Sequence, residues 1–359
     1  MGLNWPFRIL LFGLLIGVAL LLTNLLLGKN APQEKVGEGV EKIDLPTFTG
    51  LTEKSPIPTP FLFQDMTLPY LRGRGYQSSI TIVEEINKNA SYTSYLVYYD
   101  SDGLKVYGQL TRPSDEVPEG GWPAVVFVHG YIPPENYKTL VNYASHVDSL
   151  ARAGLVVFKI DLRGHGNSEG EAGGGYYAGD YVIDTLNAKS ALANMDYVNP
   201  KKIGLWGHSM AGNVVFRSWV AKSQEIPKVV IWAGAGYTYT DLQSYMISDS
   251  SYRPPATDSE RAKKRQLLID TYGSFNPNHW FWQQVPATNY LSGVNGEINI
   301  HHAVNDNVVS IEYSRNLAKV LKDQAINHKV FEYASGGHNL TGDSFSFVMQ
   351  RTAEFFKDY

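Results

Sequence analysis

Residues 203–220 read IGLWGHSMAGNVVFRSWV, and this stretch decides the fold. A short apolar run, 203–206, is followed by GHSMA and then by residues that favour a helix. This order predicts a strand, a sharp turn and a helix, with Ser209 at the apex of the turn. A nucleophile in such a strained turn needs small neighbours, because larger side chains would collide with the strand and the helix. Gly207 meets this need, and Ala211 stands where a second glycine is usual but is still small.

The rest of the chain alternates short apolar runs with stretches of helical length. The helical spacing is clearest at 137–153 and 345–355, where apolar residues recur every three to four positions. Buried runs that alternate with helices predict a parallel sheet covered on both faces. The apolar runs are 124–128, 155–160, 203–206, 229–232, 298–302 and 330–333.

Three segments upstream of these runs have a different pattern. Residues 78–86, 92–100 and 104–111 are rich in β-branched and aromatic residues, and Asp102-Gly103 between the last two is typical of a hairpin turn. They predict an antiparallel meander. The fold class is therefore α/β, with a mostly parallel central sheet, an N-terminal antiparallel meander and helices on both faces.

The connection between the runs at 229–232 and 298–302 is too long for one crossover helix. Within it, 259–272 has helical character, and 276–290 is dense in aromatic residues. We interpret about 237–290 as a cap inserted over one end of the sheet; surface decoration packed by its own aromatic residues is the alternative.

Reactive groups in parallel α/β sheets lie at the carboxyl ends of strands. Asp306 follows the run at 298–302, and His338 follows the last run after two glycines. Ser209, Asp306 and His338 therefore come after successive strands, in the order nucleophile, acid and base that a catalytic triad on this type of sheet requires. Asp241 is the competing candidate for the acid.

A further pattern predicts where a tetrahedral oxyanion would be stabilised. The run at 124–128 ends in His129-Gly130-Tyr131. In hydrolases with a serine nucleophile, the oxyanion hole is formed by two backbone N–H groups. One lies at the end of such an early strand, and the other directly follows the nucleophile. The expected donors are the N–H groups of Tyr131 and Met210. An ordinary turn is the alternative interpretation of the glycine.

With these residues in place, the chain from about 105 to 357 resembles an α/β-hydrolase, closest to the prolyl oligopeptidase and dienelactone hydrolase-like enzymes. Residues 161–170, DLRGHGNSEG, are similar to a D-x-R-G-x-G-x-S run common in these enzymes. The resemblance implies that Asp161 and Arg163 brace loops, and that a covalent acyl-Ser209 forms without cofactor or metal. It favours a peptidase. However, only about 75 residues separate the N-terminal apolar segment from the hydrolase strands, too few for that family's propeller, which raises the carboxylic esterase interpretation.

The N-terminus carries a second signal. Residues 9–27 contain no charge and as a helix would span roughly 28 Å, close to the thickness of the hydrocarbon core of a bilayer. Arg8 precedes this segment, which predicts a cytoplasmic N-terminus and an extracytoplasmic catalytic domain. The expected organisation is an anchor at 1–28, a linker and lead-in at 29–75, and the hydrolase domain at 76–359. Secretion after signal cleavage is the alternative.

Composition excludes several classes of function. The net charge of −4 gives no basic surface for nucleic acid, and the absence of cysteine excludes disulfides, thiolate metal sites and a cysteine nucleophile. Adjacent His301 and His302 would point to opposite faces of a strand, so they cannot share a metal ion. His165 and His208 are expected near the site without a chemical role.

The expected substrate is a small ester or a short peptide. A non-catalytic binding protein with the same fold and an acyltransferase with the same triad are the competing functions. The sequence leaves the oligomeric state open.

Overall fold

The computed structural model describes residues 60–359, apart from residues 174 and 177. The expected anchor at 1–28 and the expected linker up to residue 59 lie outside the described residues. Within the described part of the chain, no helix has both the length and the apolar character needed to span a membrane.

A single mixed sheet organises this part of the molecule, in the order β1-β2-β3-β5-β4-β6-β7-β8-β9. The meander β1–β3 is antiparallel and joins β5 antiparallel, whereas β4 to β9 pair in parallel. This confirms the predicted mixture of sheet types. The strands are β1 Ile80–Lys88, β2 Tyr92–Ser101, β3 Leu104–Pro113, β4 Trp122–Val128, β5 Val156–Ile160, β6 Val198–His208, β7 Lys228–Trp232, β8 Glu297–Ala303 and β9 His328–Tyr333.

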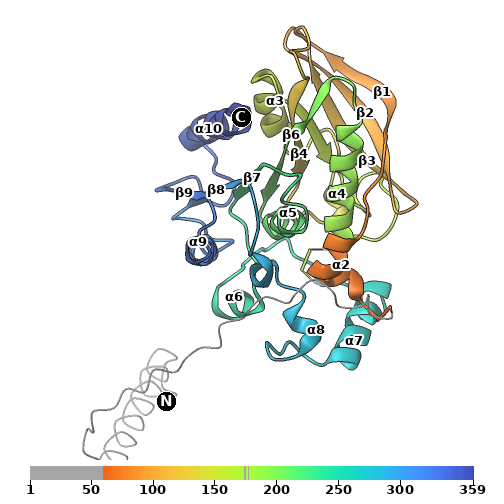
Figure 1. The fold of residues 1–359 in the computed structure, drawn as a ribbon, viewed down its shortest axis with the longest axis vertical. Helices are drawn as coiled ribbons and strands as arrows, with labels where there is room; N and C mark the ends of the chain where they lie inside the picture. Colours follow the sequence, from red (N-terminus) through yellow and green to blue (C-terminus); the bar gives the residue numbers. More distant parts are fainter. Residues whose placement is uncertain (1–59, 174, 177) are drawn as a thin grey trace, which may run out of the picture. The chain divides into compact units, whose positions relative to one another are not determined.

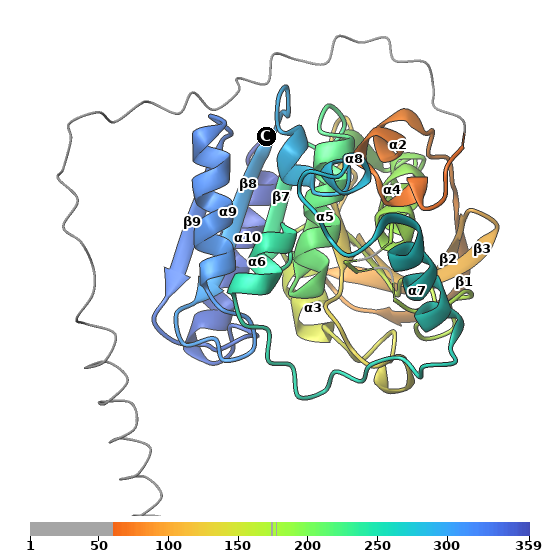
Figure 2. The same cartoon turned by 90° about the horizontal axis from the view of Figure 1, so that it is seen from below.

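Helices cover both faces of the sheet (Figures 1 and 2). Helices α4, α5 and α9 pack in one apolar cluster with the strands, and α3 and α10 pack in a second cluster on the other face. The helices are α2 Leu68–Gly73, α3 Ala144–Arg152, α4 Asp180–Ala193, α5 Met210–Ala221, α6 Tyr239–Ser244, α7 Glu260–Tyr272, α8 Trp280–Gln283, α9 Glu312–Asp323 and α10 Asp343–Lys357, with short 3-10 turns η1 Gln64–Met66, η2 Pro134–Asn136 and η3 Ala287–Tyr290.

Burial along the strands explains their sequence patterns. Every residue of β5 and β7 is buried, as expected for strands with helices on both faces. The edge strand β1 is exposed along nearly its whole length. In the sheet centre, the rings of Phe127 on β4 and Trp206 on β6 stack with centroids 3.9 Å apart. Trp206 lies three residues before Ser209, so this stacked pair supports the end of β6 that leads into the turn.

The insertion between β7 and β8 contains α6, α7, α8 and η3. Phe281 and Trp282 of α8 are buried with Leu268 of α7 in a third apolar cluster. This cluster also includes Phe63 and Met66, which precede the sheet in sequence. The aromatic residues of the insertion thus form a core of their own with the lead-in segment.

Part of the expected linker and lead-in packs against the domain. Met66, Leu68 and Leu71 are fully buried. The guanidinium of Arg72 donates to the backbone carbonyls of Val220 at 3.1 Å and Tyr290 at 2.5 Å. The folded unit therefore begins before residue 76, because α2 supplies apolar side chains that cover α5.

One helix is shorter than its apolar pattern suggested. The spacing predicts a helix over 137–153, whereas α3 begins only at Ala144. Tyr143 has φ 61°, a left-handed conformation that a right-handed helix cannot continue through. This conformation orients the Tyr143 side chain toward the carboxyl end of the sheet, where its hydroxyl is used.

Buried histidines should make the fold sensitive to mild acid. Burial lowers the pKa of His129 and of His301 to about 3. Between pH 7 and 5 the unfolded chain binds protons at these rings and the folded chain does not, so the free energy of unfolding falls as the pH falls. We expect a loss of about 2 kcal/mol for each such histidine over this range.

Urea unfolding at pH 7 and pH 5 measures this loss. In His301→Phe the drop in unfolding free energy between the two pH values should shrink by about 2 kcal/mol, because one titrating group is removed. An unchanged drop would contradict the assignment of a buried neutral ring to His301.

Candidate active site

Strand β6, the turn after it and α5 form the sharp bend predicted around Ser209. Ser209 has φ 55° and ψ −121°, a strained backbone conformation for a residue with a side chain. Its N–H donates to the carbonyl of Trp232 at 2.9 Å, which fixes the bend to β7. A Cβ on Gly207 would lie 2.6 Å from the carbonyl oxygen of Ala211, so this position requires glycine.

Asp306 and His338 meet at the same end of the sheet. Nδ1 of His338 lies 2.8 Å from Oδ2 of Asp306, and the carboxylate can only accept, so Nδ1 carries the proton and Nε2 is left as the basic nitrogen. Oδ1 of Asp306 accepts the backbone N–H groups of Val308 and Val309 at 2.8 and 3.0 Å. The competing acid, Asp241, accepts instead from Asn316 at 2.7 Å.

A second histidine, which sequence reasoning missed, also holds Asp306. Nε2 of His302 lies 3.1 Å from Oδ2 of Asp306, and Nδ1 lies 2.7 Å from the hydroxyl of Ser314. Burial alone would raise the pKa of Asp306, but hydrogen bonds from His302 and His338 outweigh it and hold this pKa below its usual range. One feature of the sequence could have predicted this contact: His302 lies at the end of the strand, and Asp306 follows it four residues later in the loop.

His208, expected to have no chemical role, links the site's loops. Its Nε2 donates to the backbone carbonyl of His338 at 2.9 Å. Nδ1 then accepts from the hydroxyl of Tyr143 at 2.7 Å, and the N–H of Gly130 donates to that hydroxyl oxygen at 3.0 Å. Burial lowers the pKa of His208 well below its usual range, so the ring is neutral. This chain of hydrogen bonds joins the loop after β4 to the loop that carries His338.

The two expected oxyanion donors lie at the start of α5 and on the loop after β4. Met210 is the first residue of α5, so its N–H has no acceptor within the helix. Tyr131 follows Gly130, whose missing Cβ would lie 3.0 Å from the carbonyl oxygen of His208. The loop that bears Tyr131 therefore packs against the residue before Ser209, although the oxyanion hole itself stays a prediction.

A segment of the insertion crosses this end of the sheet. The N–H of Ser248 donates to Val308 at 2.7 Å, beside Asp306, and the N–H of Arg253 donates to the hydroxyl of Tyr131 at 3.2 Å. The rings of Tyr131 and Tyr252 lie 5.5 Å apart. The segment 245–253 thus connects the acid's loop with the expected oxyanion loop.

The run at 161–170 anchors loops, as its resemblance implied. The Arg163 guanidinium lies 2.6 Å from Oδ1 of the buried Asp184. Asp161 accepts from the hydroxyl of Tyr137 at 2.7 Å.

Among the described residues, no three histidine or acidic side chains gather as they would around a metal ion.

Comparison with known proteins shows what this chain is similar to. A family model described as serine aminopeptidase, S33 matches residues 123–248. The uncharacterized peptidase YuxL of Bacillus subtilis is 25% identical over 269 residues, which are 74% of this chain and 36% of that protein. The chain spans little more than a third of the length of the curated relatives it matches.

Solved structures share the fold at low identity. Acetyl xylan esterase 1 from Thermoanaerobacterium superposes with a TM-score of 0.54 at 18% identity, over 80% of this chain and 90% of that one. A putative dipeptidyl aminopeptidase IV from Bacteroides ovatus has a TM-score of 0.55 at 17% identity, over 76% of this chain and 36% of that one. These similarities support a hydrolase. Together with the strand order, they show that the chain has the α/β-hydrolase fold.

Proposed function

We propose that this protein is a serine hydrolase that cleaves a carboxylic ester or peptide bond through an acyl-Ser209 intermediate. The observation that carries the proposal is the 2.8 Å contact between Nδ1 of His338 and Oδ2 of Asp306. This contact orients Nε2 of His338 as the base. His208, the neighbour of Ser209, bonds to the backbone carbonyl of His338 and holds this loop in place.

In the proposed reaction, Nε2 of His338 takes the proton of the Ser209 hydroxyl as its oxygen attacks the carbonyl carbon. The N–H groups of Tyr131 and Met210 stabilise the oxyanion, each by roughly 3 kcal/mol. His338 then protonates the leaving alcohol or amine, which departs and leaves the acyl group on Ser209. Water activated by the same ring releases the acid, while Asp306 stabilises the imidazolium.

The support for the substrate class favours an ester. Among the similar structures named above, the chain covers most of an esterase and only 36% of a peptidase. Three apolar side chains of the crossing segment are exposed beside the site, namely Met246, Ile247 and Tyr252. An apolar or aromatic acyl group would bury this surface.

Hydrolysis of p-nitrophenyl esters, compared with aminoacyl and prolyl p-nitroanilides, tests the proposal. We expect the esters to be turned over, and Ser209→Ala to lower kcat by about 10⁶, since the nucleophile is lost. A fluorophosphonate probe should label the folded wild type and not Ser209→Ala. Asp241→Asn is the matched control and should retain activity. A Ser209→Ala variant that keeps a tenth of the wild-type turnover would refute the assignment.

Tyr143 should act as a positioning residue. Tyr143→Phe keeps the ring that packs 5.4 Å from Phe127 but leaves the Gly130 N–H and Nδ1 of His208 without their partner. We expect kcat to fall about tenfold and stability to fall by about 1–3 kcal/mol.

Tyr76→Phe is the control for Tyr143→Phe, because it removes a hydroxyl that donates to Leu71 at 2.9 Å, outside the site. It should destabilise without lowering kcat. Equal kcat values for the two variants would show that the Tyr143 hydroxyl does not position the catalytic loops.

We also propose that residues 1–28 anchor the enzyme, with the catalytic domain on the extracytoplasmic side. The support is the uncharged run at 9–27 with Arg8 before it. The full chain should remain in the membrane pellet after alkaline carbonate washing, and the domain should be accessible to protease in spheroplasts. Release of a shortened chain into the medium would indicate signal cleavage instead.

A further inference from the structure

His302 and the proposed base share one oxygen atom of the triad acid. Nε2 of His302 lies 3.1 Å from Oδ2 of Asp306, and Nδ1 of His338 lies 2.8 Å from the same atom. An ionised carboxylate can only accept, so both of these ring nitrogens carry a proton. Nε2 of His302 also lies 3.1 Å from the carbonyl oxygen of Val309. Oδ2 therefore divides its negative charge between two N–H donors.

Ser314 fixes the other side of the His302 ring. Both residues are fully buried, and the hydroxyl of Ser314 lies 2.7 Å from Nδ1 of His302. In a neutral ring with the proton on Nε2, Nδ1 accepts and the hydroxyl donates. A flipped ring would turn carbon atoms toward both Ser314 and Asp306, so these two contacts hold the imidazole in one orientation.

Ser314 lies near the start of α9, and this part of the helix is bonded to the insertion. The hydroxyl of Tyr313 donates to the carbonyl of Tyr245 at 3.1 Å, and Nδ2 of Asn316 donates to Oδ1 of Asp241 at 2.7 Å. Tyr245 and Asp241 both belong to the insertion. The residues around Ser314 are thus held in place from outside their own helix, and Asp241, the competing acid, contributes to this support.

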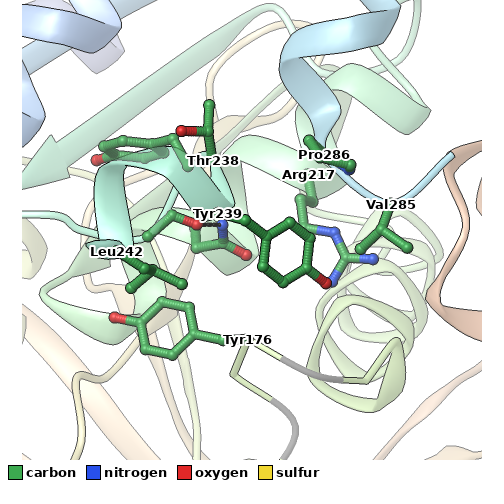
Figure 3. Close-up of a pocket in the computed structure, with 10 residues that line it drawn as sticks. Tyr176, Arg217, Thr238, Tyr239, Leu242, Val285 and Pro286 are labelled. Atoms are coloured by element: carbon green, nitrogen blue, oxygen red, sulfur yellow. Dashed lines mark hydrogen bonds between the residues drawn. The ribbon is translucent and has the colours of Figure 1, made fainter. Parts of the chain in front are cut away.

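The insertion is in turn fixed to the helix that begins directly after the nucleophile. Nδ2 of Asn213 on α5 donates to the carbonyl of Gly236, just before α6. Figure 3 shows Tyr239 and Leu242 of α6 near Arg217 of α5, with which they line one pocket. The support of α9 therefore extends through the insertion to α5, so the acid and the nucleophile are positioned on one packed unit.

The other titratable groups beside the two rings are neutral or paired. His208 faces His338 with ring centroids 4.6 Å apart, and burial lowers the pKa of His208 so far that it is neutral. Glu332 is the register partner of His302 on β9, and it is paired with Arg315 of α9 at 2.7 Å. The triad acid therefore remains the anion in direct contact with His338.

We propose that His302 and Ser314 are positioning residues of the triad, and that His302 also limits how strongly Asp306 stabilises the protonated ring of His338. This proposal rests on the hydrolase function proposed above. A hydrogen bond to an anion draws on its charge, and an anion in contact with a base favours the protonated form of that base. With His302 in place, His338 loses its proton more readily and can act as a base at lower pH.

Two substitutions of His302 in the full-length chain test the proposal. His302→Leu removes the donor beside Asp306, whereas the amide of His302→Gln can donate in place of Nε2. We expect His302→Leu to lower kcat for p-nitrophenyl acetate about tenfold with little change in KM, because the acid is less well positioned. It should also move the acid side of the kcat/KM pH profile upward by about 0.5–1 pH unit. His302→Gln should restore most of the rate and the wild-type profile.

Rates are expressed per Ser209 that a fluorophosphonate labels, so that misfolded chains are not counted. An acid side of the profile that stays in place in His302→Leu, or moves to lower pH, would overturn the proposal. A His302→Gln variant with the rate and profile of His302→Leu would do the same, because the donor would then have no effect.

Ser314→Ala tests the second contact of the ring. It should lower kcat several-fold with little change in KM, because Nδ1 of His302 loses its partner and the ring is less well fixed. Ser218→Ala on α5 is the matched control, since Ser218 is also fully buried and its hydroxyl donates within the helix to Val214 at 2.9 Å. Equal kcat values for the two variants would remove Ser314 from the proposal.

Magnetic resonance of the histidine rings keeps this test separate from the proposed hydrolysis. In the full-length chain with isotope-labelled histidine, His338→Gln identifies the signals of the His338 ring. The midpoint of their titration should lie about 0.5–1 pH unit higher in His302→Leu than in the wild type. Equal midpoints would overturn the proposal even in an active enzyme. The expected difference in a chain that hydrolyses no ester or peptide would instead refute only the hydrolase function.

Discussion

The buried carboxylate of Asp306 is the constraint on which the site's geometry depends. Its two oxygens receive four hydrogen bonds, from the N–H groups of Val308 and Val309 and from the rings of His302 and His338. A buried charge is tolerated only when it is fully paired, so these contacts fix one conformation of the loop after β8. The orientation of His338 follows from that conformation, and so does the ring nitrogen that carries the proton, Nδ1.

The strained turn at Ser209 is stable because its surroundings leave no alternative. Strand β7 binds the Ser209 N–H, Gly207 leaves room for the first turn of α5, and the loop after β4 packs on His208. The hydrogen-bond chain through Tyr143 and His208 then ties that loop to the carbonyl of His338. Strain in one residue is thus supported by the packing of four separate segments of the chain.

Much of the site could be predicted because the carboxyl ends of parallel strands meet at one edge. Ser209, Asp306 and His338 follow three apolar runs, which predicted that they lie at the same end of the sheet, and the structure pairs Asp306 with His338. His302 and Tyr143 were missed for a different reason. Their roles depend on hydrogen bonds made by a ring nitrogen and a hydroxyl, which periodicity does not reveal. The left-handed backbone of Tyr143 also delays the start of the expected helix from residue 137 to Ala144. The packing of Met66 and Leu71 on the domain could not be predicted either, because both residues lie in a stretch that we expected to be a linker and lead-in.

The sequence by itself determined the alternation of strands and helices, the turn around Ser209 and the order of the three triad candidates, since local periodicity and small residues encode these features. Only the tertiary structure decided that Asp306 rather than Asp241 bonds to His338, and that His208 bonds to the loop that carries His338. These outcomes depend on distances between residues that are remote in sequence. Such distances are set by how the helices, loops and insertion pack on the sheet, and no local pattern records them.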